Sequence, residues 1–237
     1  MAFAPQLNTF NGVTNVQLVL KDVHSDVLVE EDNESKQKVY DHRKKTNILA
    51  QVNDYIKDSE KTISVFVENR TILESLKPYA NIHNSIVNRL TSKKSDVLMF
   101  FDYPADDEVL NKVMQASGAD TIHYMNYASQ FGKNYEDMLK MFSGMIRYTC
   151  NNLSGDFNLE RAASALGVTN VVVETMLEMF EDSGMIKIVE RKENSFVIEF
   201  ISTVELSKTM HTIKYAEFVE MMNTINDYKN KFMTVEL

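Results

Sequence analysis

The sequence predicts an α/β protein, in which a parallel sheet with flanking helices is followed by a winged helix–turn–helix module and preceded by a short β-hairpin. Between residues 38 and 128, short apolar runs alternate with helical patterns, which is typical of a parallel sheet covered by helices. Between residues 157 and 201, two amphipathic patterns joined by a tight turn precede two strand-like runs, the order of a winged helix. We expect three parts, at 1–35, 36–130 and 131–237.

The composition limits the class of protein. The chain has 237 residues, a net charge of −9 and one cysteine, Cys150. A single cysteine excludes an internal disulfide framework and is typical of a reducing compartment. The sequence contains neither an apolar run long enough to span a membrane nor a charged-then-apolar signal segment at its start. We therefore expect a cytoplasmic protein with no membrane partner.

The first 35 residues predict a hairpin and a linker. Extended patterns at Gln6–Phe10 and Gln17–Val23 flank Asn11-Gly12, a strong signal for a tight turn. Residues 30–37 are polar and acidic, as in a linker. An isolated hairpin is only marginally stable in water. We therefore expect these strands to be the end of a β domain whose earlier strands are missing, and the chain to be a fragment.

The α/β part is expected to hold four strands and three helices. Its two central strands, Ile63–Val67 and Asp96–Phe101, are almost continuously apolar, as expected for strands covered on both faces. Thr46 or Asn47 is expected to cap the first helix. The other strands are expected at 38–42 and 121–124, and the other helices at 73–79 and 106–117.

The distribution of glycine excludes the common phosphate-binding loops. In parallel sheets, ligands bind beyond the carboxyl ends of the strands, and a phosphate site there needs glycines that let backbone N–H groups approach. No glycine lies between Gly12 and Gly118. The sequence therefore predicts a Rossmann-like outline without the phosphate loop. A degenerate nucleotide-binding module stays open as a weaker interpretation.

The predicted winged helix has well-marked elements. Its first helix carries one apolar face, and its second helix begins after the turn at 167–170 and ends at Gly184. Strand-like runs follow at 185–190 and 196–201, and further helices are expected at 134–150, 206–210 and 215–232. The apolar faces of the two helices are formed by Leu159, Ala162, Ala163 and Leu166, and by Val173, Met176, Leu177 and Phe180.

The charges of the second helix argue against reading of duplex DNA. No Lys or Arg lies between Ala162 and Ile186, although neutralisation of phosphates supplies much of the affinity for DNA. The outer face of this helix instead carries Glu174, Glu178 and Glu181, which we predict to form a protein-docking face. A winged-helix DNA-binding regulator remains the alternative.

The middle of the chain is the best candidate for contact with nucleic acid. Basic residues outnumber acidic ones between Lys36 and Lys94, whereas acidic residues dominate the first 35. Exposed cations with an aromatic ring are typical of sites for single strands. We predict such a site from Lys44, Lys45, Arg89, Lys93 and Lys94, with Tyr103 as a stacking platform.

No catalytic or metal-binding constellation is predicted. The five histidines show no metal-ligand spacing with one another or with Cys150. Asp41 and His42 invite a reading as an acid–histidine pair, but neighbours on a strand point to opposite faces. His123 is expected to be a satisfied histidine inside a strand. We therefore assign no catalytic residue, no metal and no cofactor to this chain.

Several short motifs resemble one family. Residues 10–23, with Phe10-Asn-Gly leading to Gln17-Leu and Lys21-Asp-Val23, resemble the closing strands of the OB-fold domain in RecJ single-stranded-DNA-specific exonucleases. They depart from the family in Phe10, where Trp is common, and in Val16, where Pro is common. The following residues resemble the extra C-terminal region of RecJ from low-GC Gram-positive bacteria. The matching motifs there are Asp41-His-Arg43, Asp102-Tyr-Pro104 and Phe180-Glu-Asp-Ser-Gly184.

The resemblance implies a role in DNA recombination and repair. RecJ enzymes degrade single-stranded DNA from the 5′ end with Mn or Mg, which Asp and His motifs of an N-terminal catalytic core bind. None of those motifs is matched here, so no catalytic residue is carried over. The resemblance therefore implies an accessory, non-catalytic C-terminal part of such an exonuclease. We expect it to dock repair proteins, such as a helicase or a single-strand binding protein, and to guide single-stranded DNA.

Overall fold

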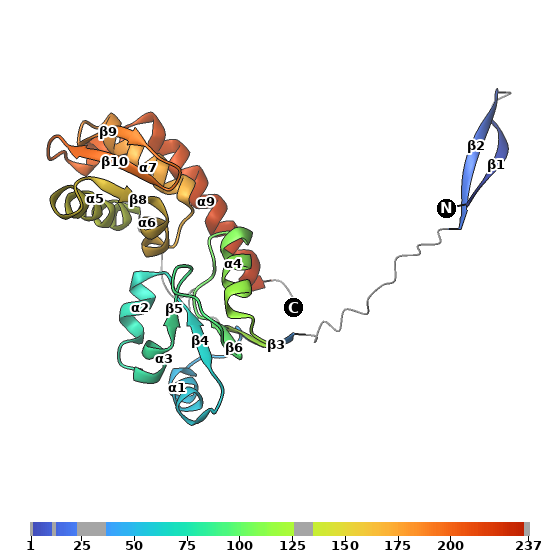
Figure 1. Cartoon of the computed structure of the whole chain (residues 1–237), viewed down its shortest axis with the longest axis horizontal. Coiled ribbons are helices and arrows are strands. Elements are labelled where there is room, and N and C mark those ends of the chain that lie inside the picture. Colours follow the sequence, from blue (N-terminus) through green and yellow to red (C-terminus); the bar gives the residue numbers. More distant parts are fainter. Residues whose placement is uncertain (1, 11–12, 23–36, 126–134, 235–237) are drawn as a thin grey trace. The chain divides into compact units, whose positions relative to one another are not determined.

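The computed structural model of the chain describes residues 2–10, 13–22, 37–125 and 135–234. It divides into two compact units, Met1–Ser35 and Lys36–Leu237 (Figure 1). The predicted boundary at residue 130 falls inside the second unit, at a position outside the described residues. It therefore stays a prediction.

The first unit is the predicted hairpin. Strand β1 (Ala2–Phe10) pairs antiparallel with β2 (Val13–Asp22), and Phe10 stands opposite Val13. The predicted pairing is confirmed. The predicted Asn11-Gly12 turn and the linker up to residue 36 lie outside the described residues. The origin of the hairpin in an OB-fold stays a prediction.

The second unit begins with a five-stranded sheet in which every pairing is parallel. The strand order is β3-β7-β6-β4-β5, so the two most apolar strands, β4 and β6, lie in the interior. This confirms the predicted α/β class. Strand β5 was not predicted, because two residues carry no alternation pattern. The strands are β3 (Lys38–His42), β4 (Ile63–Phe66), β5 (Ile86–Val87), β6 (Val97–Phe100) and β7 (Thr121–Met125).

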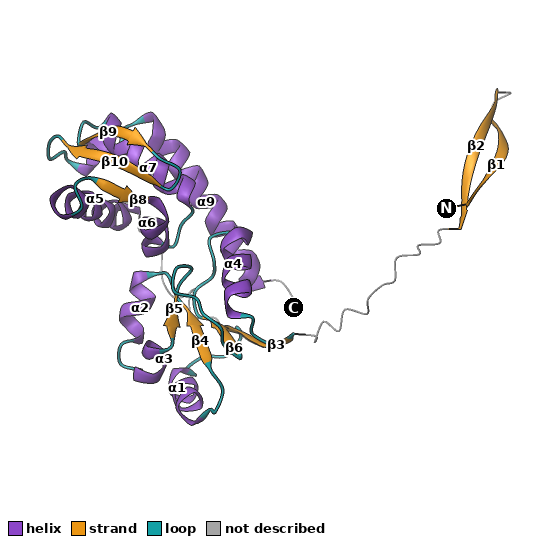
Figure 2. Cartoon of the chain, in the orientation of Figure 1, coloured by secondary structure: helices purple, strands orange, loops and turns teal. Residues whose placement is uncertain are grey.

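Helices cover both faces of this sheet. One face forms a hydrophobic core with α1, α2 and α3, and the other packs against α4 (Figure 2). Val65 and Phe66 on adjacent positions of β4 belong to these two different cores, because successive side chains point to opposite faces. The helices are α1 (Leu49–Asp58), α2 (Arg70–Leu76), α3 (Ala80–Asn84) and α4 (Asp107–Ser117).

The predicted cap of α1 is wrong. The helix begins at Leu49, and Ile48 at the cap position makes no side-chain cap hydrogen bond. Asn47 has φ 57°, a left-handed turn conformation that Asn tolerates better than most residues. In contrast, the Asn69 side chain accepts hydrogen bonds from the backbone N–H groups at the start of α2, and Asp106 caps α4.

The rest of the unit contains helices and a three-stranded antiparallel sheet of order β8-β10-β9. Thr169 accepts a hydrogen bond from the Val172 N–H and so caps α7, as predicted. Strand β8 was missed, because its three residues gain strand structure from pairing with β10. These elements are α5 (Tyr135–Asn152), β8 (Asp156–Asn158), α6 (Leu159–Leu166), α7 (Asn170–Asp182), β9 (Ile186–Arg191) and β10 (Ser195–Phe200).

Two helices complete the chain, α8 (Leu206–Met210) and α9 (Ile213–Thr234). The first half of α9 packs on α7, with Phe218 and Met222 in the same core as Met176. Its second half reaches the α/β part, where the Tyr228 hydroxyl donates a 2.5 Å hydrogen bond to Asp107 of α4 (Figure 1). Helix α9 therefore joins the two parts of the second unit.

A buried carboxylate, that of Glu68, also joins the two parts. Arg89, in the loop after β5, donates two side-chain hydrogen bonds of 2.7 and 2.5 Å to the carboxylate of Glu68, which follows β4. Their side chains are 4% and 1% exposed. The Arg89 backbone N–H and the Ser164 hydroxyl of α6 each donate a further hydrogen bond of 3.1 Å to the same carboxylate. One buried carboxylate therefore connects two loops of the sheet to the helical part.

We predict that Arg89→Met destabilises the protein by about 3–5 kcal/mol, because it leaves the Glu68 carboxylate charged and buried without its partner. Urea unfolding followed by circular dichroism measures the change. The double variant Glu68→Leu, Arg89→Met removes both charges and should be more stable than Arg89→Met alone. The exposed control Lys93→Met should stay within about 0.5 kcal/mol of the wild type. A double variant no more stable than the single one would contradict this explanation.

Candidate nucleic-acid interface

The carboxyl edge of the sheet, where ligands of such folds bind, is occupied by the chain's own groups. Asp102, which follows β6, accepts hydrogen bonds from the backbone N–H groups of Asn69 at 2.8 Å and Glu68 at 3.2 Å. Lys229 of α9 lies 3.4 Å from the same carboxylate. Asp102 is 2% exposed. Its oxygens are therefore engaged in internal contacts.

Two of the predicted nucleic-acid contacts are buried in this region. Arg89 is 5% exposed and is held by Glu68. Tyr103 is 1% exposed, its hydroxyl donates a 2.6 Å hydrogen bond to the Met125 carbonyl, and its ring stacks on Phe232. Burial raises the pKa of Tyr103 to about 12. Contrary to the expectation from sequence, neither side chain is accessible to a ligand at the surface.

The four predicted lysines are exposed but do not form one patch. Lys44 and Lys45 follow β3 at the carboxyl end of the sheet. Lys93 and Lys94 lie in the loop that returns to the opposite end, because Asp96 bonds there to Thr62, just before β4. A single bound strand that contacts one pair need not contact the other. This separation depends on the order of the strands in the sheet, which the residue pattern does not determine.

An aromatic cluster lies on β3 and β7, and its residue His42 is followed in the chain by Arg43, Lys44 and Lys45. Tyr40 and His42 of β3 both stack with His123 of β7, at ring-centroid distances of 5.0 and 5.1 Å. Tyr55 of α1 tilts against His123 at 6.4 Å. Tyr40 is 47% exposed and Tyr55 44%. Two aromatic rings are thus open to solvent next to two histidines.

The position of β3 explains this exposure. It is an edge strand, and residues Lys38 to Asp41 are all exposed. Lys38, Tyr40 and His42 share one face of the strand because they alternate with its other residues. Tyr40 stands beside His123 in the register of β3 with β7. We call Lys38, Tyr40, His42, Lys44, Lys45, Tyr55 and His123 the aromatic–lysine surface.

The surroundings of both histidines lower their pKa values and so favour the neutral rings. A nitrogen of each ring takes part in one hydrogen bond, with 2.9 Å between His42 Nε2 and His123 Nδ1. Burial, with repulsion from His42 and Lys61, lowers the pKa of His123 to about 4. Burial and Lys45 also lower the pKa of His42. The adjacent Asp41 does not hold His42, because its carboxylate binds Arg43 at 2.8 Å.

The charges around the surface are mixed but favour cations at its strand end. Lys38 shares the strand face with the two rings, and Lys44 and Lys45 follow the strand directly. Exposed Asp54 and Asp58 lie on α1, the helix that carries Tyr55. Aromatic faces next to lysines are the chemistry with which proteins hold single-stranded nucleic acid, because bases stack on the rings and phosphates meet the cations.

The predicted acidic docking face of α7 is largely engaged inside the chain. Glu178 forms ion pairs with Arg191 at 3.0 Å and Lys214 at 2.9 Å. Glu181 accepts a 2.7 Å hydrogen bond from the Ile188 N–H. Glu174 is half-buried and forms no ion pair within the part of the chain that the structure describes. The three carboxylates therefore do not form a free acidic row.

The described residues contain no cluster typical of a metal site. Among the described residues, no group of three or more His, Cys, Asp or Glu side chains is placed to hold a metal ion. Within the same residues, no helix is both long and apolar enough to cross a membrane. Comparison of the chain with protein-family models, curated proteins and solved structures finds no match.

We predict that the histidine pair makes stability depend on pH. His123 has a folded-state pKa of about 4, below its usual value of 6.5. Between about pH 4 and pH 6.5, His123 therefore binds a proton in the unfolded chain but not in the folded chain. Stability should therefore fall as the pH drops from about 6.5 to about 4, by on the order of 1 kcal/mol after allowance for solvent screening.

Thermal unfolding between pH 4 and pH 7.5 measures this effect. The matched variant His123→Asn retains a polar side chain that does not titrate, so the difference in melting temperature between wild type and variant should shrink with falling pH. A constant difference across the range would contradict the assignment.

Proposed function

We propose that the chain is the accessory, non-catalytic C-terminal part of a RecJ-type exonuclease, acting in DNA recombination and repair. In this role it contacts single-stranded DNA and docks protein partners, such as a helicase or a single-strand binding protein. The motifs Asp41-His-Arg43, Asp102-Tyr-Pro104 and Phe180–Gly184 support the family. Mn or Mg belongs to the catalytic core of such an enzyme, outside this chain. A cytoplasmic location is part of the same proposal.

The observation that carries contact with DNA is the aromatic–lysine surface. Tyr40 and Tyr55 expose nearly half of their surface, so their rings are accessible to a stacking base. Stacking of one base on such a ring contributes about 1–3 kcal/mol and tolerates any sequence. The neutral histidines add ring surface without added charge, and Lys44 and Lys45 supply the phosphate contacts. Recognition of single strands without sequence preference follows.

Segment 157–201 has the element order of a winged helix, and we assign it that fold. Its second helix, α7, is the one that reads DNA in such modules. Here seven of its residues are buried, and α9 packs along it through Phe218 and Met222. Glu178 is also tied to Lys214 of α9. These contacts favour an internal structural role for α7 over the alternative of a DNA-binding regulator.

The remaining alternative, a degenerate nucleotide-binding module, is also disfavoured. A nucleotide at the carboxyl edge of the sheet would need backbone N–H groups there for its phosphates. The N–H groups of Glu68, Asn69 and Tyr103 already donate to Asp102. The Asp102 carboxylate takes the place that an anionic ligand would fill.

We predict that Tyr40→Ala, Tyr55→Ala weakens binding of a labelled oligothymidine by about tenfold or more, since each ring contributes on the order of 1 kcal/mol or more. Fluorescence anisotropy at several salt concentrations measures the dissociation constant. The matched control is Tyr148→Ala, which removes an exposed tyrosine of α5 far along the chain from β3. An unchanged affinity in the Tyr40, Tyr55 variant would contradict the proposed surface.

The same titrations test the lysines. Lys44→Glu, Lys45→Glu should flatten the salt dependence by about 1.4 in the slope of log K against log salt, if each lysine neutralises one phosphate. Lys93→Glu, Lys94→Glu makes the same charge change at the other end of the sheet and should leave the slope nearly unchanged. Equal effects of the two variants would show long-range charge attraction in place of a local site.

A further inference from the structure

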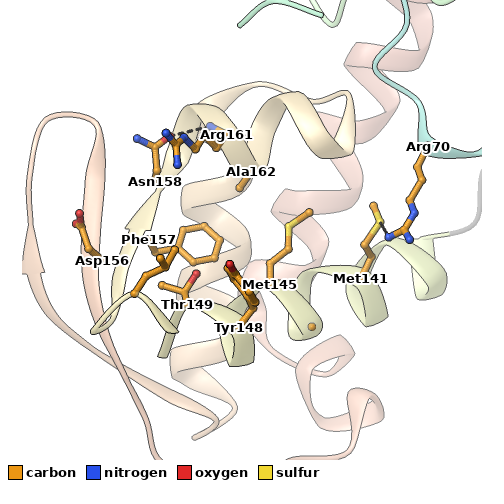
Figure 3. Close-up of a pocket in the computed structure, with 12 residues that line it drawn as sticks. Arg70, Met141, Met145, Tyr148, Thr149, Asp156, Phe157, Asn158, Arg161 and Ala162 are labelled. Atoms are coloured by element: carbon orange, nitrogen blue, oxygen red, sulfur yellow. Dashed lines mark hydrogen bonds between the residues drawn. The ribbon is translucent and has the colours of Figure 1, made fainter. Parts of the chain in front are cut away.

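A groove outside the aromatic–lysine surface lies between α5 and the segment where β8 leads into α6. It has a volume of about 800 Å³. Its lining is largely apolar, with Met141, Met145 and Tyr148 along one side of α5 and Phe157 of β8 between α5 and α6 (Figure 3). The positions 141, 145 and 148 share one helix face because they are spaced by four and three residues.

The apolar wall of the groove is partly open to solvent. Tyr148 is 59% exposed and Leu153 44%, and Met141 and Met145 are half-buried. Contiguous exposed apolar side chains of this kind mark interaction sites more often than isolated ones do. Methionine side chains adapt to the shape of a partner because they are unbranched and flexible. The groove is therefore suited to bulky apolar side chains.

Two arginines give the groove a positive rim. Arg161 of α6 lies beside Asn158 on one wall, and Arg70 of α2 lies at the end where its guanidinium contacts the Met141 sulfur at 3.7 Å (Figure 3). Within the described residues, neither arginine forms an ion pair. The carboxylate of Asp156, which also lines the groove, is 3.8 Å from Lys192. In a chain with a net charge of −9, two arginines that form no ion pair among the described residues favour an acidic partner.

We propose that this groove binds a peptide segment in which one or two bulky apolar side chains are flanked by carboxylates. The apolar side chains would lie on Met141, Met145 and Phe157, and the carboxylates would meet Arg70 and Arg161. Arginine suits this task because its planar guanidinium pairs with a carboxylate through two hydrogen bonds. The inference deepens the docking role under the proposed function, and it does not depend on contact with DNA.

The chemistry of the groove favours a peptide over the other possible occupants. A nucleic acid strand would bring a phosphate at every nucleotide to a site with only two arginines and one carboxylate among its lining residues. A second copy of this acidic chain would have to present an exposed apolar segment with carboxylates beside it. Both remain outcomes that the experiment distinguishes.

The probe is a fluorescein-labelled synthetic peptide, Asp-Asp-Phe-Asp-Asp-Leu-Phe, titrated with the whole chain in an anisotropy assay. Two control peptides replace either every Asp with Lys or every Phe and Leu with Ala. We expect binding of the acidic apolar peptide and at least tenfold weaker binding of both controls. The charge reversals Arg70→Glu and Arg161→Glu should each weaken binding at least fivefold. Arg147→Glu, on the same helix α5 but outside the groove, is the matched control and should leave binding unchanged.

A second readout locates the peptide. In a sample with ¹³C-labelled methionine methyl groups, the peptide should shift the signals of Met141 and Met145, which the variants Met141→Leu and Met145→Leu assign. The signals of the buried Met176 and Met179 should not shift when the peptide is added. In a separate control, Arg161→Glu should bind oligothymidine with the affinity of the wild type. If the wild-type chain does not bind oligothymidine, the proposed DNA contact is wrong, but the proposed peptide site is not affected.

Three results would overturn the proposal. The first is no binding of the acidic apolar peptide at about millimolar protein, with Met141 and Met145 unshifted. The second is equal binding of the lysine peptide, or displacement of the peptide by oligothymidine. The third is dimerisation of the free chain in sedimentation velocity that Arg161→Glu abolishes, since a second copy would then occupy the groove.

Discussion

The buried carboxylate of Glu68 is the constraint on which the rest of the second unit depends. It neutralises Arg89 from the loop after β5 and accepts a hydrogen bond from Ser164 of α6. Beside it, Asp102 binds backbone N–H groups and Lys229. Because two buried carboxylates need these partners, the carboxyl edge of the sheet is closed by the chain itself. The place where such sheets bind ligands is thus used here for internal structure, and surfaces elsewhere are left for function.

In the helical part, contacts with helix α9 likewise occupy a surface that could otherwise bind a ligand. Phe218 and Met222 cover α7, while Tyr228 and Lys229 reach α4 and Asp102. A helix that would read DNA in a winged-helix protein is therefore part of a shared core. The exposed features that remain are of a different kind: the aromatic–lysine surface on an edge strand, and an arginine-rimmed groove along α5. We interpret them as separate sites, one for single-stranded DNA and one for an acidic peptide.

The sequence predicted the helices and strands that have a clear hydrophobic pattern. It did not predict the short strands that form only by pairing with a neighbouring strand. Strands β4 and β6 and helices α6 and α7 were recognisable from continuous apolar runs and amphipathic faces. Strands β5 and β8 were not, because two or three residues become strand only through their neighbours. For the same reason the residue pattern predicts surface positions for Arg89 and Tyr103, although the fold buries both. The His42–His123 hydrogen bond joins residues 81 positions apart, and only the order of β3 and β7 in the sheet reveals it.

We propose that single-stranded DNA lies on the aromatic–lysine surface, away from both the carboxyl edge of the sheet and α7. Photocrosslinking with an oligonucleotide that carries 5-iododeoxyuridine, followed by mass spectrometry of the digested protein, tests it most directly. Crosslinks are expected on the peptides that contain Tyr40 and Tyr55, since an iodinated base reacts with the aromatic ring on which it stacks. Crosslinks confined to α7 or to β9 and β10, or none at saturating protein, would contradict the claim.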